Sequence, residues 1–559
     1  MKHKSVTPKL EINPIQHVKY PISILITVSI VLYIKSLNFA LTELDDSIFI
    51  NDFHVLFSDI KNLGHLFFRG VFFETNDAYY RPLLMVSFMF NKLVTGNLFG
   101  YHLTNLFFHI SSCVLLYTFF LKIKLRADIC FILALLFVVH PVLSQAVVWI
   151  PGRNDSMLTT FALVSFIALI NFIESKKTFW LPIHFVFFFA ALLTKESGII
   201  IPVICLGYCY LLTKINLKEY VLFLSGWAIL SFTWLYMRSI SIDPIINPTA
   251  SEYATGFFNR LPLYVHYIGK SILPFNLSVF PMQYDTSIVW GIVAIVLCIA
   301  IIVLNKQSNK KRLLFGFSWF VLFILPALFV PAQINEQAFE HRLYLPIIGI
   351  LIMLSETVVF SEARLSNQKL VFWTSMAIVT LFFFLNISHQ QKFKNEITFW
   401  ENAVIDSPSA SYAHKILGVK YFNRKEMAKS ETEISEALRI DSTERYANLY
   451  YAKILSTKNP KDPNIETYLL KEESYHPEFV DNLFELAKVN FDKGDKAKAQ
   501  FYLEACIRVA PGFMMAKNNL IYLLIETGKK QEALDLISQW KKDKTGVPKG
   551  LEKEVNKMP

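Results

Sequence analysis

The 559-residue sequence is poor in cysteine, and its cysteines are not spaced for cross-links or metal binding. Five of the six cysteines lie in apolar runs, and only Cys506 lies in a polar region. The sequence shows neither a disulfide framework nor the paired spacing of zinc ligands. These absences exclude a small disulfide-stabilised scaffold and a zinc-finger module.

Charged side chains are also scarce. They make up 18% of the residues, whereas hydrophobic residues make up 53% and include 50 Phe. This composition is too apolar for a soluble protein of this length and predicts a polytopic membrane protein. A net charge of +10 raises the alternative of nucleic-acid binding. However, Lys and Arg lie mainly in short loops between apolar runs and in a carboxy-terminal region where acids alternate with them, so we expect no nucleic-acid partner.

The apolar runs predict about eleven membrane spans. They lie near residues 21–39, 103–121, 128–139, 156–173, 179–193, 198–213, 219–237, 287–304, 313–330, 343–360 and 369–387. The first run lacks a small-residue cleavage pattern, so we expect an uncleaved span that follows a cytoplasmic amino terminus.

The basic loops predict the orientation of these spans. The loops at 122–126, 174–177, 213–219, 305–312 and 361–369 alternate consistently if all of them face the cytoplasm. Everything after residue 388 and the remaining loops, including the long first loop at 40–102, are then predicted to lie on the opposite side of the membrane.

After residue 388 the composition changes to helix formers with many charges, which predicts a membrane domain over 1–388 and a separate domain over 389–559. Four positions in the second domain recur after 34 residues: Ala487, Gly494, Ala499 and Leu503 return as Ile521, Gly528, Ala533 and Ile537. A period of 34 is typical of tetratricopeptide repeats, in which small residues let paired helices approach closely and Gly ends the first helix of each pair. An earlier unit fits at Leu417-Gly418 with Ala437. Such α-solenoids commonly bind peptide or protein segments.

Polar side chains gather near those span ends that are predicted to face away from the cytoplasm. Charged groups at a membrane face are costly unless they pair or serve a site, so this grouping predicts a cavity at that face. The candidates are Asp45, Asp46, Asn51, Tyr80, Arg81, His102, Asn105, His140, Arg153, Asn154, Asp155, Lys195, Glu196, Glu340, His341, Arg342 and Tyr344.

Six short motifs occur in a fixed order over about the first 390 residues and precede the repeat region: LDDSIFIN, YYRPL, HLTNLFFH, HP…WIPGRND, KESG and HRLYLP. In this order the sequence resembles the transmembrane and tetratricopeptide-repeat containing protein O-mannosyltransferases and, more broadly, the C-type (GT-C) membrane glycosyltransferases. The resemblance implies an all-α bundle, a polyprenyl-phosphate sugar as donor, and an acceptor hydroxyl on the non-cytoplasmic face. It also implies inversion at the anomeric carbon and a protein Ser/Thr acceptor held by the repeat domain.

The resemblance also implies roles for the polar residues. Asp45 matches the first acid of the family's acidic pair and is expected to be the general base, with Asp46 as the second candidate. An ordinary helix cap is the alternative for this pair. The leaving lipid phosphate calls for cationic groups, for which Arg81, Arg153, Lys195, His341 and Arg342 are the candidates.

The remaining polar residues are expected to orient the substrates: Asn51, Tyr80, His102, His140, Asp155, Glu196, Glu340 and Tyr344. For the cationic residues the alternative is interfacial snorkelling, and for Asp155 it is a salt bridge with Arg153. We expect no required metal or other cofactor, although Asp45, Glu340 and His341 are residue types that can bind a divalent cation.

Two other functions compete with sugar transfer. One is a lipid-linked sugar flippase or other transporter, which the lack of acids near span centres disfavours. The other is a non-catalytic scaffold that acts through its repeat domain. The short repeat region favours a bacterial plasma membrane with periplasmic or extracellular repeats, and the alternative is the endoplasmic reticulum membrane with luminal repeats.

Overall fold

The computed structural model describes residues 19–72, 78–242, 249–330, 337–360, 368–548 and 550–557. Within these ranges the chain is α-helical and contains no β-strand. It divides into two compact units, Met1–Ser407 and Pro408–Pro559. Most of the predicted basic loop at 361–369 lies outside the described residues.

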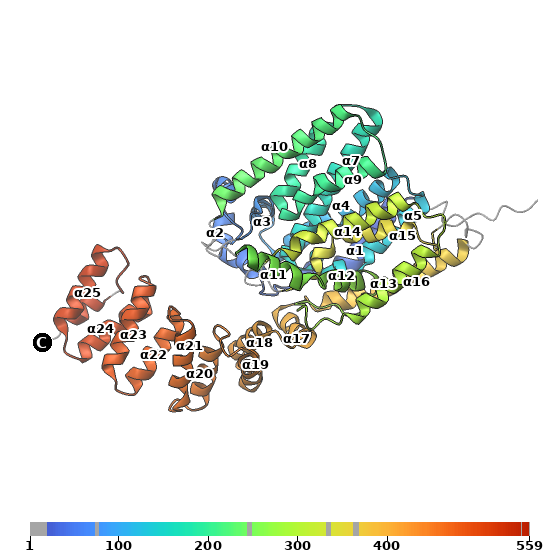
Figure 1. Cartoon of the computed structure of the whole chain (residues 1–559). Helices are drawn as coiled ribbons and strands as arrows, with labels where there is room; N and C mark the ends of the chain where they lie inside the picture. Colours follow the sequence, from blue (N-terminus) through green and yellow to red (C-terminus); the bar gives the residue numbers. More distant parts are fainter. Residues whose placement is uncertain are drawn as a thin grey trace, which may run out of the picture. The chain divides into compact units, whose positions relative to one another are not determined.

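The first unit is a bundle of long and short helices (Figure 1). Its α-helices are α1 (Pro21–Tyr33), α2 (His54–Phe57), α3 (Pro82–Val94), α4 (Leu98–Lys122), α5 (Ala127–Val139), α6 (Ser144–Val148), α7 (Arg153–Ser175), α8 (Trp180–Thr194), α9 (Ile201–Leu211), α10 (Leu217–Ser241), α11 (Ala250–Arg260), α12 (Leu263–Ile272), α13 (Val289–Val303), α14 (Lys310–Leu328), α15 (Ile347–Ser355), α16 (Gln368–Gln391) and α17 (Glu396–Asp406). The shorter helical turns are η1 (Ile34–Asn38), η2 (Ile48–Asp52), η3 (Ile60–Phe67), η4 (Pro141–Leu143), η5 (Ile150–Gly152), η6 (Glu196–Ile200) and η7 (Glu340–Leu343).

Fewer helices are long enough to cross a membrane than the sequence predicted. Among the described residues, six are long and apolar enough, and a seventh is gained if α5 and the segment Pro141–Val148 form one span bent by 53°. Four further apolar helices are shorter: Pro82–Val94, Trp180–Thr194, Glu196–Leu211 and Val289–Val303. The predicted span at 343–360 contains only the 9-residue helix α15, because Pro346 starts this helix late.

The bend after α5 places a polar motif deep inside the first unit. His140 has extended backbone angles, as expected for a residue before a proline, and so ends α5. Its Nδ1 then accepts the N–H of Val142 (3.3 Å) and caps the next turn. All residues from 137 to 160 are buried, so the start of α7 lies in the protein interior rather than at its surface.

The first unit extends beyond residue 388, where the composition of the sequence changes. Helix α17 belongs to this unit because Trp400 is fully buried in it and its Nε1 donates to the carbonyl of Thr42 (3.0 Å). Ala40 also donates from its backbone to the carbonyl of Lys394 (3.0 Å). Both contacts anchor the segment that leads into the LDDS motif.

The second unit consists of short helices that pack in consecutive pairs (Figure 1). They are α18 (Ser411–Asn423), α19 (Met427–Ile440), α20 (Ala447–Lys458), α21 (Asn464–Tyr475), α22 (Val480–Asp492), α23 (Lys496–Val509), α24 (Met514–Glu526), α25 (Lys530–Lys542) and α26 (Leu551–Asn556).

Small residues and glycines act in the second unit as the sequence pattern predicted. A Cβ on Gly418 would lie 2.7 Å from Cγ1 of Ile434, so the glycine allows α18 and α19 to approach closely. Gly494 (φ 82°) and Gly528 (φ 72°) follow α22 and α24 in the left-handed conformation that glycine adopts easily. Ala499 and Ala533 are fully buried between the paired helices.

Candidate active site

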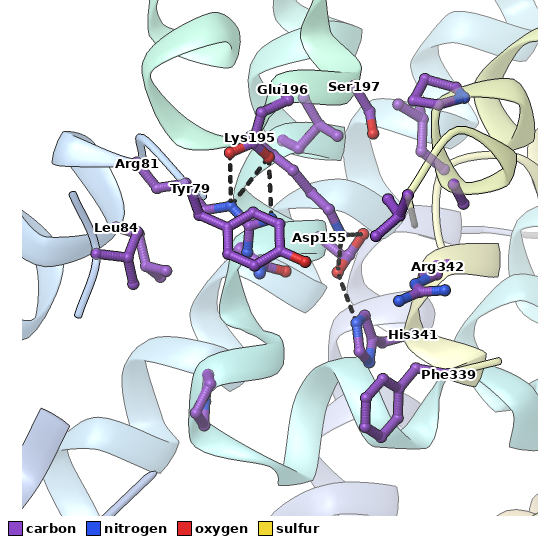
Figure 2. A pocket seen from close by; sticks show the side chains of 18 of the residues that line it. Tyr79, Arg81, Leu84, Asp155, Lys195, Glu196, Ser197, Phe339, His341 and Arg342 are labelled. Atoms are coloured by element: carbon purple, nitrogen blue, oxygen red, sulfur yellow. Dashed lines mark hydrogen bonds and ion pairs between the residues drawn. The ribbon is translucent and has the colours of Figure 1, made fainter. Parts of the chain in front are cut away.

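A cavity of about 470 Å³ in the first unit brings several of the sequence motifs together (Figure 2). Its lining comes from the starts of α7 and η6 and from the ends of α8, α10 and α14, so these helix ends meet at one side of the bundle. Of the residues predicted from sequence, the lining includes Asp45, Arg81, Asp155, Lys195, Glu196, His341 and Arg342.

The two adjacent acids, Asp45 and Asp46, lie in different environments. Asp46 is buried and folds back on Thr42, whose backbone N–H and hydroxyl donate to its Oδ2 at 2.7 and 3.0 Å. The turn from Thr42 to Asp46 passes through Glu43, which has a left-handed backbone conformation (φ 54°). Asp45 lines the cavity, and no hydrogen-bond partner for its carboxylate is found within the described ranges. The structure therefore assigns a local structural contact to Asp46 and leaves Asp45 available to a ligand.

Burial shifts the ionisation of Asp45. Burial, together with the neighbouring charge of Asp46, raises the pKa of Asp45 to about 6, although Arg81 partly opposes this shift. A carboxylate with this pKa is mostly ionised at neutral pH and is a stronger base than an ordinary surface aspartate. The pKa therefore suits a group that accepts a proton during a reaction.

Two ion pairs lie among the residues that line the cavity (Figure 2). Glu196 accepts from Arg81 at Nε (3.1 Å) and Nη2 (2.9 Å), and the guanidinium lies 4.4 Å from the ring centroid of Tyr79. The ammonium of Lys195 donates to both carboxylate oxygens of Asp155, at 2.7 and 2.8 Å. These pairs neutralise two of the predicted phosphate-binding cations and hold them in place.

His341 extends this second ion pair. Its Nε2 lies 3.9 Å from Oδ2 of Asp155. Burial and the nearby charges of Lys195, Arg342 and Arg81 hold the pKa of His341 well below its usual range. The imidazole is therefore neutral, and it can act as a hydrogen-bond donor or acceptor rather than as a cation.

The cations of the cavity outnumber its carboxylates. Four cationic side chains (Arg81, Lys195, Arg238 and Arg342) and three carboxylates (Asp45, Asp155 and Glu196) line it. Arg342 donates from Nη1 to the carbonyl of Gln337 (2.9 Å), and no described carboxylate lies within ion-pair distance of it. An anion that enters the cavity would thus meet at least one guanidinium that is not neutralised by an acid.

The segment that carries His341 and Arg342 is held by a buried network. Oε1 of Gln145 accepts the backbone N–H groups of Glu340 and His341, both at 3.1 Å. Glu340 accepts from Lys270 (2.7 Å) and from the backbone N–H of Ser278 (2.8 Å). Glu340 does not line the cavity, so it supports the segment instead of contacting a ligand there.

Arg153, a predicted phosphate-binding residue, instead joins three helices. It is fully buried, and its guanidinium donates to Oδ1 of Asn105 (2.7 Å), the carbonyl of Tyr101 (2.7 Å) and Oγ of Ser87 (3.0 Å). Its Cζ also lies 4.9 Å from the ring centroid of Phe88. These contacts occupy the guanidinium and place it outside the cavity lining, and they do not include the alternative pair with Asp155.

Besides Glu340, five more of the predicted substrate-orienting residues lie outside the lining. The hydroxyl of Tyr80 donates to the carbonyl of Phe67 (2.8 Å), and Asn51 is exposed on η2. Nε2 of His102 donates to the carbonyl of Phe39 (3.2 Å), Nε2 of His140 donates to that of Ser271 (3.0 Å), and the hydroxyl of Tyr344 is hydrogen-bonded to Nδ1 of His109 (2.7 Å). All except Asn51 are buried side chains with internal partners.

Sequence reasoning missed several lining residues. Arg238 lies in the last turn of the long apolar helix α10 and donates from Nη2 to the carbonyl of Ala78 (3.2 Å). The available signal in the sequence was a lone arginine near the end of a predicted span. Trp149 and Phe339 also line the cavity, although aromatic residues are too abundant in this sequence to single out two of them, and Asn154, one of the polar candidates from the sequence, lies in the lining as well. The described residues contain no group of three or more His, Cys, Asp or Glu side chains arranged to hold a metal ion.

Together, the fold and the cavity define a polytopic α-helical membrane protein with a buried, net cationic site. One carboxylate, Asp45, faces this site without a partner among the described side chains.

Comparison with known proteins narrows this class. Human protein O-mannosyl-transferase TMTC4 is 24% identical over 438 residues, covering 64% of this chain and 58% of the human protein. Caenorhabditis elegans protein O-mannosyl-transferase F38B6.6 is 22% identical over 366 residues, covering 63% of this chain and 52% of the nematode protein. Mouse protein O-mannosyl-transferase TMTC1 is 32% identical over 152 residues, covering 25% of this chain and 16% of the mouse protein. No family model matches the chain.

The chain is therefore a distant homologue of the TMTC protein O-mannosyltransferases, which confirms the resemblance found in the sequence. The two longer matches span about half the length of the relatives, at 52% and 58%.

Proposed function

We propose that the protein is a membrane glycosyltransferase that moves a mannose-like hexose from a polyprenyl-phosphate donor to a hydroxyl group of a protein acceptor. Homology to protein O-mannosyltransferases supports the reaction class. The observation that carries the proposal is the presence of two complementary groups in one cavity. Asp45 is a carboxylate with a raised pKa, and Arg342 is a guanidinium with no carboxylate partner among the described residues.

In the proposed reaction Asp45 accepts the proton of the acceptor hydroxyl as the hydroxyl oxygen attacks the anomeric carbon. The bond between that carbon and the phosphate oxygen breaks, and the lipid phosphate leaves with the bonding electron pair. Arg342 stabilises the charge that develops on the phosphate, while the ion pairs of Arg81 and Lys195 keep further positive groups nearby. Attack opposite the leaving group inverts the anomeric configuration.

We further propose that the first unit has the GT-C architecture, with about eleven spans that include the shorter apolar helices and a cavity on the non-cytoplasmic face. The second unit is then a tetratricopeptide-type solenoid on that face. It holds the acceptor segment, which raises the local concentration of acceptor hydroxyls. Glycines with positive φ at a spacing of 34 residues, Gly494 and Gly528, support the repeat assignment. A bacterial plasma membrane remains the proposed location.

The proposal is tested by exchanging each of the two adjacent acids separately. Asp45→Asn should lower sugar transfer in the host by about 10²- to 10⁴-fold, the usual contribution of general-base catalysis. Asp46→Asn should lower the yield of folded protein but retain transfer per folded molecule, because Asp46 contacts only its own turn. Glycoproteomics of the host, normalised to membrane-inserted protein, distinguishes these results. Equal transfer by wild type and Asp45→Asn would instead favour the scaffold or the transporter.

A further inference from the structure

Three aromatic rings gather at one side of the cavity. The ring centroids of Trp149, Phe339 and His341 lie 6.1 Å (Trp149–Phe339), 5.2 Å (Phe339–His341) and 5.5 Å (Trp149–His341) apart. The planes of the three rings differ by only 23° to 37°. All three residues belong to the cavity lining, and Phe339 and His341 lie beside Asp155 and Arg342 in Figure 2.

Polar atoms without partners lie on the same part of the lining. Within the part of the chain that the structure describes, Nε1 of Trp149, Oδ1 of Asn154 and Nδ1 of His341 have no hydrogen-bond partner. These side chains belong to residues that are only 4%, 5% and 7% exposed. Buried donors and acceptors are normally paired, so unpaired ones that line a cavity point to a ligand.

The chemistry of this group is that of a neutral, hydroxylated ligand. The indole N–H can only donate, the amide oxygen can only accept, and the neutral imidazole can do either. A hydrocarbon tail would leave these atoms unpaired. A phosphate would gain little from an amide oxygen, whereas hydroxyl groups match both donors and acceptors, and the C–H faces of a sugar ring suit aromatic surfaces.

The neighbouring charges fit a sugar that is linked to phosphate. Cζ of Arg342 lies 5.9 Å from the ring centroid of Phe339, so the guanidinium that lacks a carboxylate partner lies next to the aromatic group. His341 also lies next to the Asp155–Lys195 pair, with 3.9 Å between its Nε2 and Oδ2 of Asp155. A sugar ring placed on the aromatic group would therefore carry its phosphate toward Arg342.

We infer that Trp149, Phe339 and His341, together with Asn154, form the pyranose subsite of the cavity. The subsite contacts the ring of the donor sugar and binds its hydroxyl groups. This inference rests on the proposed function and deepens it, because it separates the residues that recognise the sugar ring from those that recognise the lipid phosphate.

The test compares two probes on the purified full-length protein: farnesyl-phosphate mannose and farnesyl phosphate without a sugar. Wild type should bind the mannosyl probe about tenfold more tightly or better, since several hydrogen bonds depend on the ring. Asn154→Ala and Trp149→Leu should bring this affinity ratio close to one, while the affinity for farnesyl phosphate stays unchanged. Trp149→Phe should retain part of the ratio, because it keeps an aromatic surface, although a smaller one, and loses the N–H.

The unchanged affinity for farnesyl phosphate also shows that a variant is folded. If Trp149→Leu no longer binds farnesyl phosphate, the affinity ratios of Asn154→Ala and Trp149→Phe decide whether the subsite exists. Arg342→Gln is the matched control and should weaken both probes by a similar factor. Variants that bind farnesyl phosphate normally and keep the wild-type ratio would overturn the subsite alone, as would equal binding of both probes by wild type. Binding of neither probe by wild type would overturn the proposed function itself.

Discussion

The most deeply buried ion pair of the described residues lies in the first unit, whereas most ion pairs of the second unit are partly or largely exposed. In the first unit the side chains of Lys270 and Glu340 are 1% and 0% exposed and pair at 2.7 Å. In the second unit Lys458 and Glu431 pair across neighbouring helices with exposures of 49% and 30%. Ions are costly to bury, so we interpret the buried pairs as supports of a site. The exposed pairs belong to the solvated surface of a helical array, where they contribute little.

The largest expected effect is on the free energy of unfolding, and it differs between a buried and an exposed ion pair. Lys270→Met leaves Glu340 buried without its partner and should lower the free energy of unfolding by about 3–5 kcal/mol. Lys458→Met, the control on the second unit, should lower it by less than about 1 kcal/mol. Thermal unfolding of the purified proteins in detergent measures both values. Similar shifts for the two variants would contradict the proposed contrast.

A smaller expected effect is on donor binding, and it distinguishes two arginines of the first unit. Arg342→Gln should raise KM for the polyprenyl-phosphate donor by about 10- to 100-fold, since hydrogen bonds to charged groups contribute about 1.5–3 kcal/mol. Arg153→Gln should lower stability but leave KM of the remaining folded enzyme near that of wild type, because Arg153 donates to Asn105 and Tyr101 instead. Steady-state kinetics with a donor series measures the difference. An equal rise in KM for both variants would place Arg153 in the donor site.

The pH dependence of transfer should report the raised pKa of Asp45. A general base must be ionised, and the pKa of Asp45 is raised to about 6. As the pH falls below 6, kcat/KM should therefore fall about tenfold per pH unit, and above 6 it should level off. Neutral His341 adds no second step in this range, because its pKa lies well below the usual value. A profile that stays flat down to pH 4.5 would exclude Asp45 as the base.

The smallest expected effect concerns the turns of the second unit. Gly494→Ala forces a residue with a Cβ into a left-handed conformation (φ 82°) and should destabilise the turn between α22 and α23 by about 1 kcal/mol. Gly512→Ala is the matched control, because Gly512 has no atom within 4 Å of an added Cβ and no positive φ. Hydrogen exchange of the amides in α22 and α23 measures the change. Equal exchange in both variants would argue against a conformational role for Gly494.

Much of the fold could be predicted from the sequence because its signals are local. Composition predicted membrane helices, and the 34-residue period predicted the glycine turns at Gly494 and Gly528. The exact number of spans could not be predicted. Pro141 and Pro346 mark breaks that can be seen in the sequence, but whether the helices around such a proline form one bent span or separate short helices depends on packing inside the bundle.

The candidate site was predicted in part, for a related reason. Motif order pointed to Asp45, Arg81 and Arg342, which the cavity brings together. The ion pairs Arg81–Glu196 and Lys270–Glu340 join residues that are 115 and 70 positions apart, and such partners follow only from tertiary packing. For the same reason, the sequence left Arg153 among the candidates for binding the phosphate, although its guanidinium is already occupied.

The most direct test of the account is sugar transfer by the purified protein in lipid vesicles. The assay uses polyprenyl-phosphate mannose and acceptor peptides that contain Ser and Thr, and it compares wild type with Asp45→Asn. We predict an O-linked product of inverted anomeric configuration with wild type and a loss of about 10²-fold or more with Asp45→Asn. Equal product from both proteins, or no product from wild type with any polyprenyl-phosphate hexose, would contradict the assignment of this cavity as a transferase site.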